Sequence, residues 1–204
     1  MTRELGLAAR RLRVAAAAVA GTGLLGASFA AEPDSPEFYG LTLTTAASWA
    51  LGGLLPDIGD DQPERPITSP ILIGAGAFAV FYGCALIARR IPFLRKEIAS
   101  VLRYAEQGPT PRVLLITLAN GAAEEIFFRG AVYSVAGSKP VVVSTGIYAC
   151  VTAATRNPAL VLASIFMGAL FGLQRRATGG IRAPLLTHMT WSALMLRYMP
   201  RLFH

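Results

Sequence analysis

Two adjacent glutamates lie inside an apolar stretch, where charged groups are rare. Of the twelve acidic residues, only Glu124 and Glu125 fall within such a span. A charge at mid-membrane costs on the order of 3 kcal/mol, so these side chains usually face the bundle interior and have a function. Helical spacing pairs Glu125 with Arg129, four residues on, and turns Glu124 about 100° away. We therefore expect Arg129 to neutralise Glu125 and Glu124 to remain without a partner, as a general base or acid.

A second pair of polar residues lies in the last apolar segment. His188 and Ser192 are four residues apart and share a helix face. Histidine titrates near physiological pH and is a candidate proton shuttle or ligand. Taken alone, a single histidine in an apolar helix is more often a hydrogen-bonded core residue than a site residue. A purely structural role is also open for the glutamate pair and its arginine, since buried ion pairs can serve specificity alone.

The elements that must position these residues are apolar and uncharged. The chain of 204 residues is 53% hydrophobic and 15% charged, against about 25% charged in soluble proteins. A helix needs about 20 mainly apolar residues to cross a bilayer. The composition predicts an all-α, polytopic membrane helix bundle of about seven spanning or partly spanning helices, over residues 14–31, 38–56, 66–88, 113–136, 140–155, 158–174 and 183–196. Ser164, Gly168 and Gly172, at spacings of four, form a seam of small residues that lets two membrane helices approach closely.

A basic connector divides these segments into two expected parts. Residues 89–112 carry apolar side chains at helical spacing among arginines, which predicts an interfacial amphipathic helix. We expect residues 1–111 to hold the N-terminal membrane segments and this connector, and residues 112–204 to form the core that carries the chemistry. The net charge of +7 forms no single patch, so the sequence does not favour a nucleic-acid partner.

The first apolar segment, residues 14–31, ends in a sequence similar to a signal-peptide cleavage site. An uncleaved first span is favoured, because six further segments follow. The positive-inside rule places both the N-terminus and the connector in the cytoplasm. Three crossings would instead separate them, so orientation stays open and one early segment could be re-entrant. We expect a multi-pass protein of a bacterial plasma membrane, with the lipid bilayer as its first partner.

Two motifs resemble a known family. Glu124-Glu125-x-x-x-Arg129 and the stretch 176–188, which contains Pro-x-x-x-His, are similar to motifs of the CPBP family of intramembrane proteases. That family includes the type II CAAX prenyl endopeptidases and related bacteriocin-processing and self-immunity proteins. The resemblance covers residues 112–203.

The resemblance implies a role for each matching residue. Glu124 would activate the attacking water, and His188 would be the last of two site histidines. Ser192 stands where the family has an asparagine that supports the oxyanion. Glu125 and Arg129 would support the site.

The middle motif of the family departs most from the pattern. Phe-x-x-x-His is matched here by Tyr148 to Thr152, so threonine occupies the histidine position. No histidine lies between Arg129 and His188. The resemblance makes a divalent metal such as zinc possible, with Glu124 and His188 as ligands. Catalytic zinc has three protein ligands, so the set is incomplete and the cofactor stays unknown.

Three functions follow as hypotheses. The first is a CAAX-protease-like endopeptidase in which Glu124 activates water to cleave a hydrophobic or prenylated membrane-associated peptide. The alternative is a catalytically inactive family member that acts as a membrane binding or immunity protein. A third, a small transporter whose buried glutamate carries a proton, lacks the paired broken helices typical of transporter repeats.

Overall fold

The computed structural model describes residues 2–54, 67–108 and 110–203. Within these ranges the chain is helical and contains no strand, which confirms the all-α prediction. The helices are α1 (Thr2–Ser28), α2 (Pro36–Leu54), α3 (Thr68–Ala88), α4 (Pro92–Glu106), α5 (Thr110–Glu124), α6 (Tyr133–Val135), α7 (Pro140–Thr152), α8 (Pro158–Thr178) and α9 (Arg182–Tyr198). A π-helical segment, η1 (Glu125–Val132), joins α5 to α6, and two 3₁₀ turns, η2 (Ala153–Thr155) and η3 (Pro200–Leu202), follow α7 and α9.

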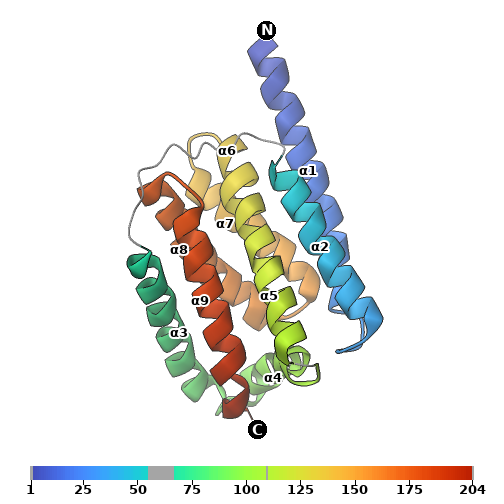
Figure 1. Cartoon of the computed structure of the whole chain (residues 1–204), viewed down its shortest axis with the longest axis vertical. Helices are drawn as coiled ribbons and strands as arrows, with labels where there is room; N and C mark the ends of the chain where they lie inside the picture. The colour runs from blue at the N-terminus through green and yellow to red at the C-terminus, as the bar shows by residue number, and fades with distance from the viewer. Residues whose placement is uncertain (1, 55–66, 109, 204) are drawn as a thin grey trace.

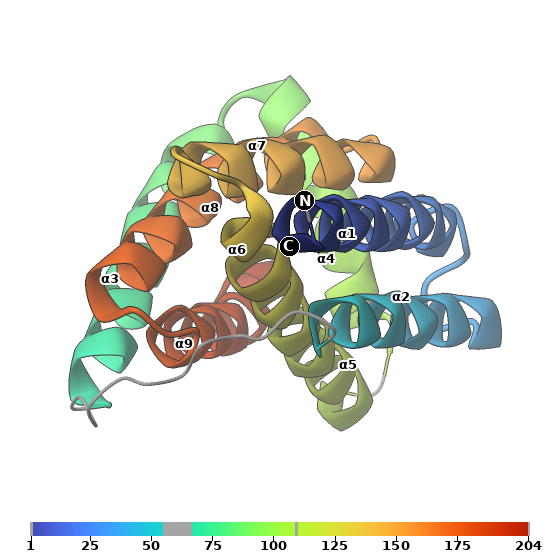
Figure 2. The same cartoon turned by 90° about the horizontal axis from the view of Figure 1, so that it is seen from above.

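The long helices form a bundle in which α5 lies between α2 and α9 (Figures 1 and 2). Helices α1 and α2 pack together on one side, while α7 packs on α8 and α3 on α9 on the other (Figures 1 and 2). Helix α5 contacts both α2 and α9. Because α1, α2 and α3 each traverse the bundle, the N-terminus and α4 lie at opposite ends (Figure 1). The re-entrant early segment and the membrane orientation of the chain stay predictions.

Proline and asparagine define where several helices begin. Proline occupies the first turn of α4, α7 and α8, where its missing N–H costs no helical hydrogen bond. Asn157 caps α8 by accepting a hydrogen bond from the Leu160 backbone N–H at 3.0 Å. Its amide nitrogen also donates to the Glu97 carbonyl oxygen at 2.8 Å and to the Ser100 hydroxyl at 3.0 Å. This one residue therefore ties the start of α8 to α4.

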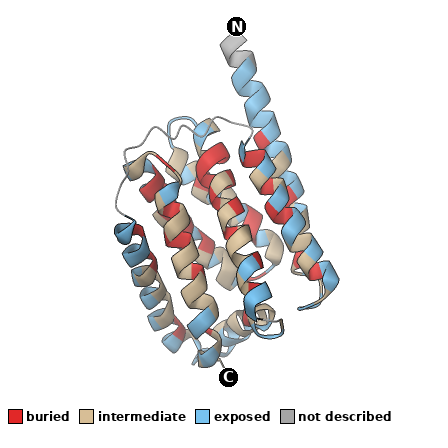
Figure 3. Cartoon of the chain, viewed as in Figure 1, coloured by how far each residue is buried: buried red, intermediate tan, exposed pale blue. Residues whose placement is uncertain are grey.

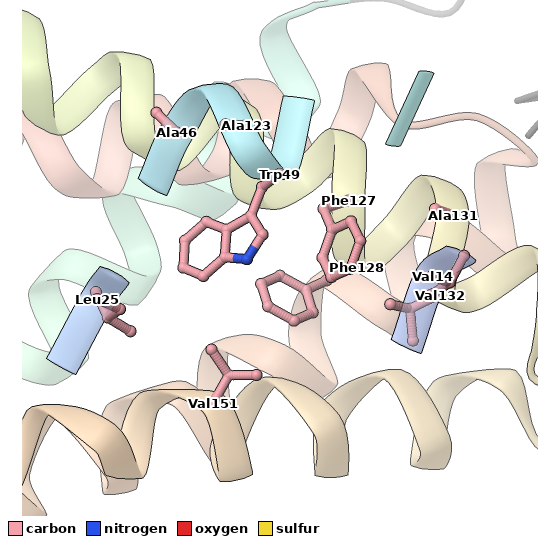
Figure 4. Packing of buried hydrophobic residues seen from close by; sticks show 10 residues of the cluster. All are labelled: Val14, Leu25, Ala46, Trp49, Ala123, Phe127, Phe128, Ala131, Val132 and Val151. Carbon is pink, nitrogen blue, oxygen red and sulfur yellow. The ribbon is translucent and has the colours of Figure 1, made fainter. Parts of the chain in front are cut away.

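An aromatic core joins the N-terminal helices to η1. Trp49 of α2 is fully buried, with its ring centroid 5.5 Å from that of Phe128 and 6.5 Å from that of Phe127. Val14 and Leu25 of α1 complete one side of this cluster (Figure 4). Both expected parts of the chain thus contribute to one core, and the boundary between residues 1–111 and 112–204 stays a prediction.

Large apolar side chains cover the outside of the bundle. Helices α3 and α8 are the two described helices that are long and apolar enough to cross a membrane. On α3, Leu72, Val80 and Ile87 are 71%, 65% and 66% exposed, and the helix presents mostly exposed residues (Figure 3). Side chains of this kind suit a lipid environment better than water. The count of about seven spans remains a prediction.

Candidate active site

The site begins where α5 changes from α-helix to π-helix. Glu124 is the last residue of α5 and Glu125 the first of η1, so the helix type changes between the two acids. Single π turns inside α-helices occur frequently at functional sites. Ser144 of α7 donates to the Phe128 carbonyl oxygen at 2.8 Å, and Arg175 of α8 donates to the Arg129 carbonyl oxygen at 3.1 Å. Two neighbouring helices therefore hold the π segment, which the assumption of a continuous α-helix had missed.

Glu125 and Arg129 form a buried ion pair. The Arg129 Nη1 lies 3.2 Å from the Glu125 Oε1, and both side chains are 0% exposed. The Arg129 guanidinium also lies over three aromatic rings, 4.6 Å from the Tyr148 centroid, 4.9 Å from the Phe171 centroid and 5.9 Å from the Phe128 centroid. Cation–π contacts of this kind strengthen when water is excluded. The predicted pair is present, and it lies in the dry interior of the bundle.

Glu124 has two neutral partners, so the expectation that it lacks a partner is wrong. The Asn120 side-chain amide donates to its Oε1 at 3.0 Å. The Tyr148 hydroxyl donates to its Oε2 at 2.7 Å. Helical spacing separated Glu124 from Arg129, but spacing within α5 could not reveal a donor on α7.

His188 lies between the two acids and faces each with a different ring nitrogen. Its Nδ1 is 2.8 Å from the Glu125 Oε1, and its Nε2 is 4.0 Å from the Glu124 Oε2. Because the Glu125 carboxylate paired with Arg129 acts as an acceptor, we assign the ring hydrogen to Nδ1, which leaves Nε2 toward Glu124. The ring stacks on Phe171, with the centroids 4.7 Å apart. Ring orientation is thus fixed by one hydrogen bond and one stacking contact.

A cavity of about 290 Å³ opens beside this cluster. Four of the predicted site residues line it, namely Glu124, Thr152, His188 and Ser192. Most of the remaining lining is apolar and comes from α1, α2, α4, α5, α8 and α9. The amphipathic helix α4 lies at the bundle end shown near the C-terminus in Figure 1 and contributes four of the lining residues, Val101, Leu102, Tyr104 and Ala105.

The predicted residues divide into two groups by position. Glu125 and Arg129 are buried away from the cavity, whereas Glu124, Thr152, His188 and Ser192 border it. The Thr152 hydroxyl donates to the Tyr148 carbonyl oxygen of its own helix at 2.8 Å. The catalytic roles assigned to all six residues remain predictions.

Asn120 and Tyr148 are two cavity residues that the sequence reasoning did not identify. Asn120 stands one helical turn before Glu124, so its spacing alone could have predicted the contact. Tyr148 stands at the phenylalanine position of the middle motif. The hydroxyl that tyrosine has and phenylalanine lacks could have indicated a polar role. Which residue it contacts depends on how α7 packs against α5.

The side chains around the cavity do not make a complete zinc site. Among the described residues, no group of three or more histidine, cysteine, aspartate or glutamate side chains could hold a metal ion. Glu124 and His188 supply two donors, and Thr152 supplies a hydroxyl bonded to its own helix. Catalytic zinc has three protein ligands. The donor set does not fit zinc, so the chemistry below is derived from the side chains alone.

Comparison with known proteins identifies the segment that carries these residues. A family model described as type II CAAX prenyl endopeptidase Rce1-like matches residues 106–194. No individual curated protein and no solved structure matches the chain. The match includes the glutamate pair, Arg129, Tyr148 to Thr152, His188 and Ser192. Residues 106–194, just under half of the chain, are therefore similar to the type II CAAX prenyl endopeptidases, and this match supports assigning the segment to the CPBP family.

Proposed function

We propose that this chain is an active intramembrane endopeptidase in which Glu124 activates a water molecule in the cavity. The observation that carries the proposal is the facing pair of Glu124 Oε2 and His188 Nε2, 4.0 Å apart at the cavity wall. Both atoms accept hydrogen bonds, and one water molecule can donate a hydrogen to each of them. A water held in this way keeps its oxygen lone pairs free for attack.

Hydrolysis then proceeds by general base and general acid steps. The water oxygen attacks the scissile carbonyl carbon while Glu124 takes one of its protons. The carbonyl oxygen becomes an oxyanion, to which the Ser192 hydroxyl at the cavity wall can donate a hydrogen bond. Glu124 returns its proton to the amide nitrogen as the carbon–nitrogen bond breaks, which releases a carboxylic acid and an amine.

Glu125 and Arg129 act through His188 in this mechanism. The Glu125 carboxylate accepts the Nδ1 hydrogen at 2.8 Å and so keeps Nε2 unprotonated and directed toward Glu124. Arg129 neutralises Glu125, which would otherwise be an uncompensated charge in a fully buried position. The pair is thus a support for the histidine and does not contact the substrate.

The substrate class follows from the lining of the cavity. Apolar side chains from six helices surround the polar cluster, so the bound segment should be hydrophobic and enter from the membrane. We propose a membrane-associated peptide, prenylated or otherwise apolar, and a multi-pass location in a bacterial plasma membrane.

The test is proteolysis by the purified protein in liposomes, with farnesylated and unmodified hydrophobic peptides as probes. Glu124→Gln removes the base and keeps the size of the side chain. We expect its rate to fall by at least a hundredfold. The matched control is Glu37→Gln, an exposed glutamate at the start of α2, which should cleave at the parental rate. Equal rates for parent and Glu124→Gln would remove Glu124 from the mechanism.

One observation favours a second function, that of an inactive family member that binds a membrane partner or confers immunity. Thr152, at the position of the middle histidine, uses its hydroxyl within its own helix. Under this alternative, a cellular phenotype survives Glu124→Gln, and Thr152→His creates a proteolytic activity that the parent lacks. Loss of the phenotype in Glu124→Gln, at normal protein level, would reject it.

A further inference from the structure

Tyr148 makes the shorter of the two hydrogen bonds to the proposed base. Its hydroxyl donates to the Glu124 Oε2 at 2.7 Å, and Tyr148 itself lines the cavity. Asn120 donates to the other carboxylate oxygen at 3.0 Å. The two donors come from different helices, α7 and α5, and they bind different oxygens. Together they prevent the carboxylate from rotating about its terminal bond.

The tyrosine ring is itself held in place by its neighbours. Its centroid lies 4.8 Å from that of Phe128 and 4.6 Å from the Arg129 guanidinium carbon. Gly168 of α8 leaves the space that the ring occupies, because a Cβ there would lie 3.3 Å from the Tyr148 Cδ1. A hydroxyl on a ring fixed in this way is a preorganised donor, which loses little entropy when it binds Glu124.

The other polar residue of α7 that borders the cavity does not reach Glu124. Thr152 lies one turn later on α7 and also borders the cavity, but its hydroxyl is bonded to the Tyr148 carbonyl oxygen. The polar group that α7 directs to Glu124 is therefore the tyrosine hydroxyl. Where the family motif has phenylalanine and then histidine, this chain has a hydroxyl-bearing ring and then threonine.

We propose that Tyr148 is a positioning residue for Glu124: its hydroxyl, one turn before Thr152 on α7, holds the carboxylate in a chain that has no histidine at position 152. The proposal rests on the proposed proteolytic function. It deepens that function, because it explains how a chain with an incomplete motif keeps its base fixed beside His188.

The test compares Tyr148→Phe with the double variant Tyr148→Phe/Thr152→His in the liposome assay. Tyr148→Phe removes only the hydroxyl and should lower kcat by about tenfold to a hundredfold, the effect of losing one hydrogen bond to a carboxylate. KM should stay within about twofold, because the ring that borders the cavity is unchanged. The double variant restores the family motif and should recover at least about tenfold in kcat over Tyr148→Phe. A purely structural role for the hydroxyl would not be rescued in this way.

The control is Tyr82→Phe on α3, which removes a hydroxyl from a ring that packs on Phe78. It should leave kcat at the parental value. A Tyr148→Phe variant with parental kcat would overturn this inference. The proposed function would still stand if cleavage by the parent depended on Glu124. A double variant no faster than Tyr148→Phe would also overturn it. A parent no faster than Glu124→Gln would overturn the inference and the proposed function together.

Discussion

Removing the Arg129 side chain tests how the interior of the site is held. In Arg129→Met an unbranched apolar side chain remains but the guanidinium and its charge are lost, and Glu125 becomes a buried carboxylate without its cation. Both groups are 0% exposed, so solvent cannot compensate. Breaking a buried pair by removing one partner costs about 3–5 kcal/mol. For a chain of this size, 1 kcal/mol shifts Tm by about 2–4 °C, so we expect Tm to fall by about 6–20 °C.

The double variant Arg129→Met/Glu125→Gln separates lost charge balance from lost packing. Its glutamine retains an oxygen that can accept the His188 Nδ1 hydrogen, and no uncompensated charge remains. We expect it to recover at least half of the Tm loss. The measurement is thermal unfolding followed by near-UV circular dichroism in one detergent. The reasoning is refuted if Arg129→Met melts within about 2 °C of the parent, or if the double variant melts no higher than the single one.

Two glycine positions give further predictions. An alanine Cβ at Gly21 of α1 would overlap the buried indole of Trp49, so Gly21→Ala should destabilise the protein by about 1–3 kcal/mol, measured as a lower Tm. An alanine Cβ at Gly121 of α5 would lie 2.8 Å from the Met189 Cε and 3.3 Å from the His188 Nε2. Gly121→Ala should therefore displace the imidazole and lower kcat by about tenfold, measured in the liposome assay.

Each glycine has a matched control in the bundle. A Cβ at Gly23, on the same helix as Gly21, meets nothing within 4 Å, and alanine there should raise Tm slightly through its higher helix propensity. A Cβ at Gly146 of α7 likewise meets nothing within 4 Å, so its alanine variant should cleave at the parental rate. Equal effects at the paired positions would contradict the packing described above.

The helices were largely predictable because charge and proline delimit them. The uncharged run 66–88 corresponds to α3, and 158–174 lies within α8. The amphipathic pattern over 89–112 corresponds to α4. The small-residue seam on α8 packs against α7, where a Cβ at Gly172 would lie 3.0 Å from the Val141 Cγ1. Each of these features depends on a short stretch of sequence, so a local pattern is enough to predict it.

The geometry at Glu124 was predictable only in part. The pairing of Glu125 with Arg129 follows from a spacing of four, which brings the residues together even within the π-helical η1. The change to π-helix leaves no trace in side-chain periodicity. The contact with Tyr148 joins residues 24 positions apart and depends on the packing of α7, which no spacing rule within α5 contains.

The joint action of Glu124 and His188 on one water molecule is tested most directly by a kinetic double-mutant cycle. We would measure kcat for Glu124→Gln, His188→Gln and the double variant, with thermal unfolding of each as a check on folding. When two residues act as a unit in catalysis, the double variant loses no more activity than the slower of the two single variants. We predict that the double variant is no slower than the slower single variant. Multiplicative losses, or a single variant at the parental rate, would contradict the shared water.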